Sequence, residues 1–232
     1  MTPSAVRAVI FDCDGVLVDS EPTHAKATSE HLASLGTPIA PELFDRLIGM
    51  RVRDQMDVVA KLTGHDADAL FTGREARFWK LIHAEFPAMP DAAETIRRLH
   101  AGGFVIGVAT SGTREYIDHV VSQLHISHLV AAVTCGDDVR QPKPDPECYL
   151  RTASAMGVPA SRCAAVEDSE LGAASAAAAR MQVLRLNRDG GAVWASTRRD
   201  FSSLASIGDY LLATPVATRA ESALIGGGDP PR

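Results

Sequence analysis

Two patterns of apolar residues divide the chain near Pro87. Before Pro87, apolar residues recur at the three- and four-residue spacing of helices, whereas after Pro90 such stretches alternate with short continuous apolar runs typical of buried strands. One further run of the strand type, Val6–Phe11, stands near the amino terminus. Because a lone strand cannot bury both of its faces, we expect this run to join the sheet formed by the later strands.

The region between the first strand and Pro87 predicts helices only. The expected helices are Glu21–Leu35, Pro41–Ile48, Arg51–Leu62 and Ala67–Phe86. Glycines end the first three, and Gly73 is a candidate break in the fourth. An all-helical stretch between one strand and the rest of its sheet indicates an insertion into an α/β core.

The second half predicts a parallel sheet, because strands that alternate with helices imply right-handed crossovers. The expected strands are Phe104–Ala109, Ala131–Thr134, Cys163–Val166 and Gln182–Leu186, and the expected helices cover about 92–102, 116–124, 146–156 and 171–180. We therefore predict a Rossmann-like α/β core of residues 1–17 and 87–213 and a helical domain of residues 18–86. Residues 214–232, rich in Ala, Gly and Pro, predict a disordered tail.

Composition narrows the function classes. The 232 residues are 46% hydrophobic and 22% charged, as in soluble globular proteins, and the net charge of −6 argues against a nucleic-acid or anionic-membrane surface. No apolar run is long enough to span a membrane, and no signal peptide is visible. The four cysteines lack C-x-x-C spacing, which favours reduced cytosolic thiols.

Two carboxylates, Asp12 and Asp14, follow the first strand at its carboxyl end, where ligands of open α/β sheets bind. In extended chain, residues two apart point the same way, and paired like charges are costly unless a cation lies between them or one is protonated. Mg²⁺ prefers oxygen ligands and would offset that cost. A surface turn is the alternative for Asp-x-Asp-Gly. An EF-hand loop is excluded because its twelfth position, Thr23, is not Glu.

Polar motifs also follow the later strands. Thr110-Ser111-Gly112 suits phosphate oxygens or a plain helix cap. Lys143 lies on a proline-rich loop and is either a surface charge or a partner for a nucleophile and a phosphoryl group. Glu167-Asp168-Ser169 is a second acidic motif or another helix cap. Because the carboxyl ends of these strands share one edge of the sheet, the motifs together favour a phosphate and metal site.

The ordered set Asp12-x-Asp14-Gly15-Val16, Thr110-Ser111-Gly112, Lys143-Pro144 and Glu167-Asp168-Ser169 resembles the haloacid dehalogenase superfamily. The resemblance extends to about Leu212. It is strongest to subfamily I, in which a helical cap follows the first motif and which includes β-phosphoglucomutase and small sugar-phosphate phosphatases. It implies the haloacid dehalogenase fold for the α/β core and a cap role for residues 18–86.

The resemblance also implies residue roles. Asp12 would be the nucleophile that becomes an aspartyl-phosphate, and Asp14 the general acid and base. Mg²⁺ would be held by Asp12, Asp168 and the backbone carbonyl of Asp14, with Glu167 able to ligate directly or through water. The phosphoryl oxygens would be bound by Thr110, Ser111, Gly112 and Lys143. An acid at position 14 argues for phosphate monoesters, because family members that cleave other bonds lack it.

The cap would close over the site and contact the leaving group. The candidate substrate residues of the cap are five cationic side chains and one histidine: Arg51, Arg53, Arg74, Arg77, Lys80 and His24. The alternative for each is an exposed residue on a helix surface. Phe78 and Trp79 are expected to pack in the cap core. Resemblance to the mutases predicts an arginine three residues after Gly49, but Val52 stands there, which weakens a mutase assignment.

Three hypotheses remain. The first is a Mg²⁺-dependent phosphatase of a small phosphorylated metabolite, a sugar phosphate being the expected class. The second is a phosphosugar mutase of the β-phosphoglucomutase type, and the third is a non-catalytic regulator or scaffold, which the intact acidic and lysine motifs disfavour. We expect no nucleic-acid or membrane partner, a cytoplasmic location, and a monomer or small homo-oligomer.

Overall fold

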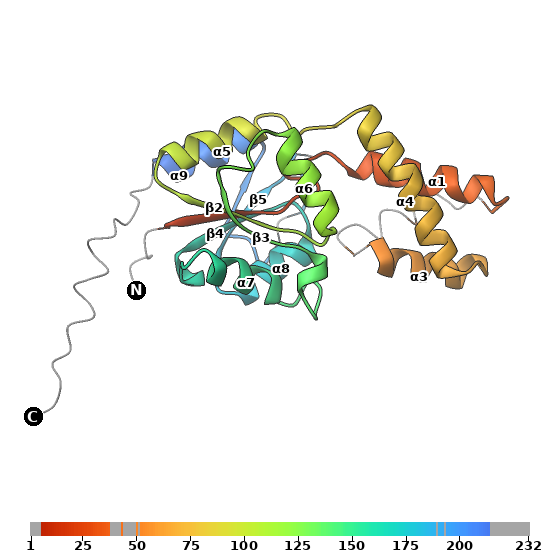
Figure 1. The fold of residues 1–232 in the computed structure, drawn as a ribbon. Coiled ribbons are helices and arrows are strands. Elements are labelled where there is room, and N and C mark those ends of the chain that lie inside the picture. The colour runs from red at the N-terminus through yellow and green to blue at the C-terminus, as the bar shows by residue number, and fades with distance from the viewer. Residues whose placement is uncertain are drawn as a thin grey trace, which may run out of the picture.

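The computed structural model describes residues 6–37, 43, 50, 52–188, 190–192 and 194–213. Its centre is a six-stranded, wholly parallel sheet in the order β3-β2-β1-β4-β5-β6 (Figure 1). The strands are β1 (Ala8–Phe11), β2 (Val105–Ala109), β3 (Val130–Thr134), β4 (Cys163–Glu167), β5 (Gln182–Leu186) and β6 (Arg199–Phe201). The parallel α/β sheet predicted from the alternating pattern is therefore confirmed.

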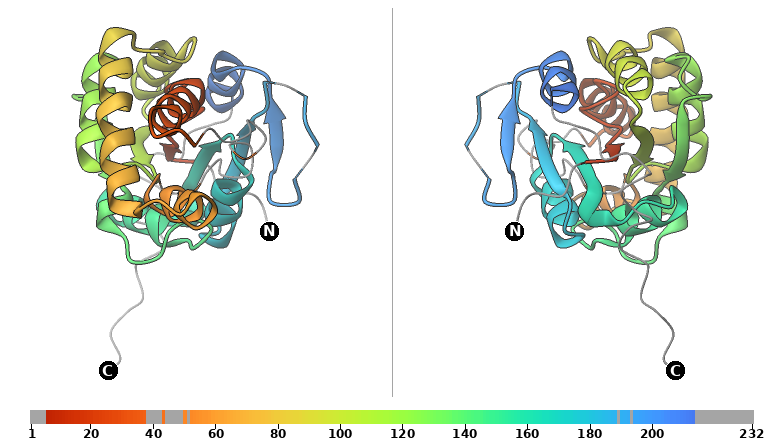
Figure 2. Two further views of the ribbon diagram at one scale, coloured as in Figure 1. Left: turned by 90° about the vertical axis from the view of Figure 1, so that its right-hand side faces the viewer. Right: turned by 90° about the vertical axis from the view of Figure 1, so that its left-hand side faces the viewer.

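Helices cover both faces of the sheet, as buried parallel strands require (Figures 1 and 2). One face carries α5 (Ala92–Ala101), α6 (Arg114–Gln123) and α9 (Leu204–Leu212), and the other carries α7 (Glu147–Ala155) and α8 (Glu170–Ala178). Strand β1 shows the alternation: Val9 and Phe11 pack in the first core, while Ala8 and Ile10 pack in the second. Short 3₁₀ turns lie at Gly136–Asp138 and Ala160–Arg162.

Three helices lie beyond the carboxyl end of β1, away from the sheet (Figure 1). They are α1 (Glu21–Ser34), α3 (Val52–Thr63) and α4 (Ala67–Ala84). Among the residues described between Asp19 and Phe86 there is no strand, and a separate apolar cluster of Leu32, Met56, Val59 and Leu70 holds the helices together. The segments that lead from the sheet into these helices and back lie side by side, and the Asp19 amide donates to the Pro87 carbonyl at 2.8 Å.

One expectation about the helical region needs correction, and two others fall on residues that the structure does not describe. Helix α4 runs through Gly73 without a break, and this glycine lies against α1, where a Cβ would stand 2.1 Å from the His31 ring. The helix predicted at Pro41–Ile48 and the tail predicted at residues 214–232 lie outside the described residues, apart from Leu43, which is helical.

The end of the chain holds two elements that the apolar pattern did not predict. Strand β6 is short and adds a polar edge to the sheet, beside β5. Helix α9 packs on α5, and Gly208 of α9 lies against Thr95, where a Cβ would stand 3.1 Å from the threonine methyl. In the described part of the chain, no helix has both the length and the hydropathy needed to cross a membrane.

Candidate active site

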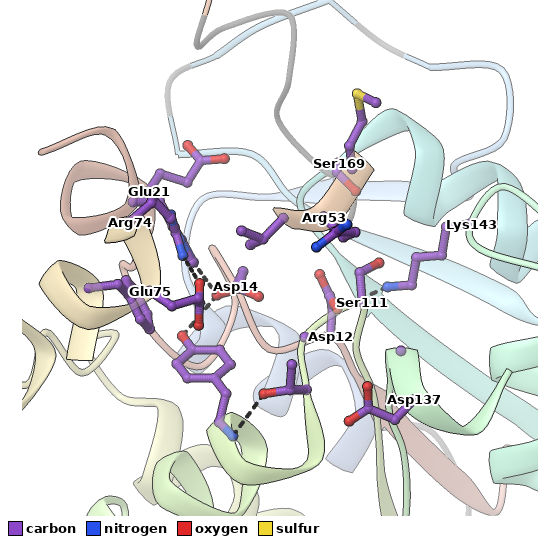
Figure 3. Close-up of a pocket in the computed structure, with 18 of the residues that line it drawn as sticks. Asp12, Asp14, Glu21, Arg53, Arg74, Glu75, Ser111, Asp137, Lys143 and Ser169 are labelled. Carbon is purple, nitrogen blue, oxygen red and sulfur yellow. Dashed lines mark hydrogen bonds and ion pairs between the residues drawn. The ribbon is translucent and has the colours of Figure 1, made fainter. Parts of the chain in front are cut away.

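The motif residues gather at the carboxyl edge of the sheet because four of its strands end there side by side. Asp12 follows the central strand β1, Thr110 follows β2 on one side, and Asp168 follows β4 on the other. Lys143 reaches the same place from the loop after β3. Sequence positions more than 150 residues apart thus line one cavity of about 280 Å³ (Figure 3).

Lys143 is the buried cation of this edge. Its Nζ donates to Oδ1 of Asp12 at 2.9 Å, to Oε1 of Glu167 at 2.6 Å and to the Ala109 carbonyl at 3.2 Å. Burial alone would lower the pKa of Lys143, but the facing carboxylates raise it well above its usual value, so the ammonium stays charged. The alternative of a solvated surface lysine is therefore wrong.

The loop that carries Lys143 is fixed from both ends. One carboxylate oxygen of Glu147, at the start of α7, accepts hydrogen bonds from the backbone amides of Arg140 and Gln141 at 2.9 and 3.0 Å. The Ser175 hydroxyl of α8 donates to the Asp145 carbonyl at 2.6 Å. These contacts place the lysine without using its own side chain.

Three carboxylates crowd around one point of the site. Asp12, Glu167 and Asp168 each offer an oxygen within 4.8 Å of the others. Burial, and then the charge of Glu167, raises the pKa of Asp12 to about 7 despite Lys143. Burial, and then the charge of Asp12, raises the pKa of Asp168 well above its usual value. Crowded carboxylates with raised pKa values and hard oxygen donors fit a divalent cation such as Mg²⁺.

Asp14 lines the same cavity as Asp12 but lies outside the cluster of three carboxylates. Strand β1 ends at Phe11, so the two-residue period stops before Asp14, where the chain turns through Gly15. The Asp14 carboxylate instead accepts hydrogen bonds from Ser20 and from the Tyr116 hydroxyl, and His24 lies 3.6 Å away. In Figure 3, Arg74 and Glu75 lie on the side of Asp14, and Lys143 and Ser111 lie toward Asp12.

The Thr110-Ser111-Gly112 segment does not cap the helix that follows it. Helix α6 is capped by Thr113, whose hydroxyl accepts from the Tyr116 amide at 3.3 Å. Thr110 is buried and its hydroxyl accepts from the Gly112 amide at 3.0 Å, which shapes a tight turn. Ser111 and Gly112 line the cavity beside Asp12 and Lys143, and the Gly112 carbonyl accepts from the Gly136 amide at 2.8 Å, so this turn is held from within.

Helix α8 resolves the other capping alternative. Ser169 is its cap and accepts from the Gly172 amide at 3.1 Å. Asp168 is thereby left to face the cavity, while Glu167 is fully buried and receives hydrogen bonds from Lys143, from the Tyr149 hydroxyl and from Ser169. The two acids of this motif are therefore in different environments: Asp168 lines the cavity and Glu167 supports the site from beneath.

Of the candidate substrate residues on the helical region, three line the cavity: His24, Arg53 and Arg74. Arg77 turns instead to α1, where it contacts His31 and Ser34, and Lys80 is exposed. Arg51 lies outside the described residues. The expectation that Phe78 and Trp79 pack in the cap core is wrong: Phe78 is buried in the apolar cluster that continues into the sheet core, and Trp79 packs partly against the same cluster.

Several residues of the site were not predicted from the sequence. Tyr116 and Tyr149 donate to Asp14 and Glu167, and Glu75 pairs with the buried Arg74. Both tyrosines stand at positions where a helix presents its apolar face to the sheet, so their pattern is that of ordinary core residues. No local signal distinguishes their hydroxyls from those of structural tyrosines.

Comparison with known proteins agrees with this geometry. The family model for the haloacid dehalogenase-like hydrolases matches residues 6–180. Protein CbbY of Rhodobacter capsulatus is 31% identical over 191 residues, covering 77% of this chain and 84% of that protein. Hexitol phosphatase B of Escherichia coli (strain K12) is 30% identical over 190 residues, covering 78% and 83%. The crystal structure of CbbY from Rhodobacter sphaeroides in complex with phosphate superposes with a TM-score of 0.75 at 22% identity, covering 88% of this chain and 96% of that one.

Proposed function

Because the chain belongs to the haloacid dehalogenase-like hydrolases, we propose that it is a Mg²⁺-dependent phosphatase of a small phosphate monoester. The observation that carries the proposal is the arrangement of Asp12 and Asp14 in one cavity, with Lys143 bonded to the first and hydrogen-bond donors to the second. A sugar or sugar-alcohol phosphate is the expected substrate, since the relative named hexitol phosphatase B is similar over most of its length.

Asp12 is the nucleophile in this proposal. One of its carboxylate oxygens bonds to phosphorus as the bond from phosphorus to the leaving oxygen breaks, which gives an aspartyl-phosphate and a free alcohol. Lys143 and the backbone amide of Ser111, which line the cavity, bind the phosphoryl oxygens, whose charge must be stabilised throughout the transfer. Thr110 shapes this turn by accepting a hydrogen bond from the Gly112 amide. Because Oδ1 of Asp12 accepts a hydrogen bond from Lys143, we assign the attack on phosphorus to Oδ2.

Asp14 moves the protons. It gives a proton to the leaving oxygen in the first step, and in the second it takes a proton from water as that water attacks phosphorus. The bond from Asp12 to phosphorus then breaks and inorganic phosphate leaves. Its position beside the nucleophile, but outside the acidic cluster, supports this division of labour.

The residues that would hold Mg²⁺ are Asp12 and Asp168, with Glu167, the third carboxylate of the cluster, ligating directly or through water. The family resemblance adds the backbone carbonyl of Asp14. The bound ion would offset the repulsion between Asp12 and the phosphate dianion. Space for the Asp168 carboxylate is made by Gly15, where a Cβ would lie 1.7 Å from Oδ2 of Asp168.

We further propose that residues 18–86 act as a cap that excludes water and selects the leaving group. Helices α1 and α4 supply His24, Arg74, Glu75 and Glu21 to the cavity wall, opposite the sheet edge. The paired connections around Val18 and Ala88 form a narrow link between the two parts of the chain. Such a link is where a closing motion would be hinged.

The charges on the cap favour hydrolysis over the mutase alternative. A mutase must hold a sugar that carries two phosphates, which calls for cations on the cap. The described arginines that line the cavity are already paired, Arg74 with Glu75 and Arg53 with Asp68. They support a neutral leaving group, as in a sugar or sugar alcohol.

The test is phosphate release from a panel of esters with Mg²⁺ or EDTA. The panel holds glucose 6-phosphate, a hexitol phosphate, 6-phosphogluconate, β-glucose 1-phosphate and p-nitrophenyl phosphate. Wild type should release phosphate only with Mg²⁺, and Asp12→Asn should lower kcat/KM by roughly a thousandfold or more. The control is Asp209→Asn, on the exposed side of α9, which should keep wild-type activity.

Two outcomes would redirect the assignment. Conversion of β-glucose 1-phosphate to the 6-phosphate without net phosphate release would show a mutase. If wild type hydrolyses none of the esters, with or without Mg²⁺, the non-catalytic scaffold becomes the favoured hypothesis.

A further inference from the structure

Tyr116 joins the core helix α6 to the side chain of Asp14. Its hydroxyl donates to Oδ1 of Asp14 at 2.8 Å, and the side chain is 4% exposed. Burial, and then the charge of Asp14, raises the pKa of Tyr116 well above its usual value, so the hydroxyl remains a donor. The hydrogen bond spans 102 positions of sequence and is set by tertiary packing.

Among the described residues, the hydrogen-bond and ion-pair partners of the Asp14 side chain all contact its Oδ1 atom. Ser20 and Tyr116 donate to Oδ1, and His24 Nε2 lies 3.6 Å from it. Among the interactions of the described residues, none involves Oδ2, although Asp14 lines the cavity. Fixing one oxygen of a carboxylate through several donors sets the direction of the other. Here the oxygen left over is the one that can exchange a proton with a ligand.

The Tyr116 ring is held independently of its hydroxyl. It meets Phe78 at 5.5 Å between ring centroids and 67°, and Trp79 at 6.4 Å and 74°, both edge-to-face contacts with α4. A phenylalanine would keep these contacts, because they use only the ring. Tyr116→Phe therefore removes the donor while leaving the packing between α4 and α6.

We propose that Tyr116 is a positioning residue for the general acid: its hydroxyl fixes Oδ1 of Asp14 so that Oδ2 delivers the proton to the leaving oxygen. The inference rests on the proposed phosphatase function. It adds a residue whose position on α6 lies outside the four motifs that carry the family resemblance.

The experiment compares two leaving groups. An alkoxide such as that of glucose 6-phosphate needs a proton as it departs, whereas p-nitrophenolate is stable without one. We use kcat/KM, because it covers only the steps up to loss of the leaving group and omits hydrolysis of the aspartyl-phosphate. Tyr116→Phe should lower kcat/KM about 10- to 100-fold for glucose 6-phosphate but less than about threefold for p-nitrophenyl phosphate.

Tyr210→Phe is the matched control, since this hydroxyl contacts Gln182 at the amino end of β5, opposite the sheet edge that holds the cavity. It should leave both values unchanged. Equal losses on both esters in Tyr116→Phe, or no loss on either, would overturn the inference while the phosphatase assignment stands. If wild type hydrolyses none of the esters of the panel, the phosphatase assignment fails and the inference fails with it; if it hydrolyses another sugar phosphate in place of glucose 6-phosphate, that ester takes its place in the comparison. Thermal unfolding of Tyr116→Phe checks that the fold is intact.

Discussion

Gly15 and Gly172 make room for the acidic residues of the site. Gly15 has a φ of 71°, in the left-handed region, and a Cβ there would meet Asp168. Gly172, in the first turn of α8, lies against Glu167 in the same way, since its Cβ would stand 2.0 Å from Oε1. Both carboxylates thus occupy space that any other residue would fill.

Gly15→Ala should weaken Mg²⁺ binding, because the new methyl group displaces Asp168. We expect the Mg²⁺ concentration for half-maximal activity to rise about 10- to 100-fold, as for changes beside metal ligands. The control is Gly157→Ala, which has a similar φ of 65° but nothing within 4 Å of its Cβ. Both variants should lose about 1–2 kcal/mol through backbone strain. An equal effect of both variants on Mg²⁺ dependence would contradict the prediction.

At the scale of elements, the helical region depends on a close contact between α1 and α4. Gly73 lies inside α4, facing the ring of His31, which is buried and whose Nδ1 accepts a hydrogen bond from Arg77 at 2.9 Å. A glycine inside a helix normally costs about 1 kcal/mol relative to alanine. Here it lets two helices approach, so the usual helix preference does not decide the residue.

Gly73→Ala should therefore destabilise the protein, although alanine is the better helix former. Its Cβ would lie 2.1 Å from the His31 ring, which must move or push α1 away. We expect a lower Tm in the single variant and, in a His31→Ala background, a higher Tm on the same change. Thermal unfolding of all four proteins in this double-mutant cycle measures the coupling. A rise in Tm in the wild-type background would contradict the prediction, because it would show that the His31 ring moves aside at little cost.

At the scale of the whole molecule, the site makes stability depend on pH and metal together. The pKa of Asp12 is about 7 in the folded protein, against 3.8 for an unperturbed carboxyl. The folded state therefore holds a proton that the unfolded state has released between these values. The contribution of this proton to the free energy of unfolding is fully present below the unfolded-state pKa and is lost as pH rises through the folded-state pKa. Asp168, whose pKa is also raised, adds to the effect.

The Tm of the metal-free protein should accordingly decrease as pH rises from about 5 to about 8. Added Mg²⁺ should raise Tm more at the higher pH, where protons no longer compete for the carboxylates. Scanning calorimetry with EDTA or excess MgCl₂ measures both trends. Asp12→Asn should flatten the pH dependence of the metal-free protein. A Mg²⁺ effect that is the same at both pH values would show that these carboxylates are not the ligands.

Much of the architecture was determined by the sequence itself. Continuous apolar runs and helical spacing reflect burial, which acts on short segments, and so β1, β2, β4 and β5 end within one or two residues of their predicted limits. Polar motifs at those limits had to meet, because parallel strands bring their carboxyl ends to one edge. Strand β6 was missed, since a three-residue polar edge strand has no apolar run to mark it. Helix α9 was also missed, although Leu204, Ile207 and Leu211 recur there at helical spacing.

The tertiary structure alone decided the orientation and partners of individual side chains. Asp14 lies outside the cluster of three carboxylates although it lines the same cavity, and Tyr116 reaches it only through the packing of α6. Arg74 lines the cavity while Arg77, one turn further along α4, faces α1. Such outcomes depend on contacts between residues far apart in the chain, and local pattern carries no information about them.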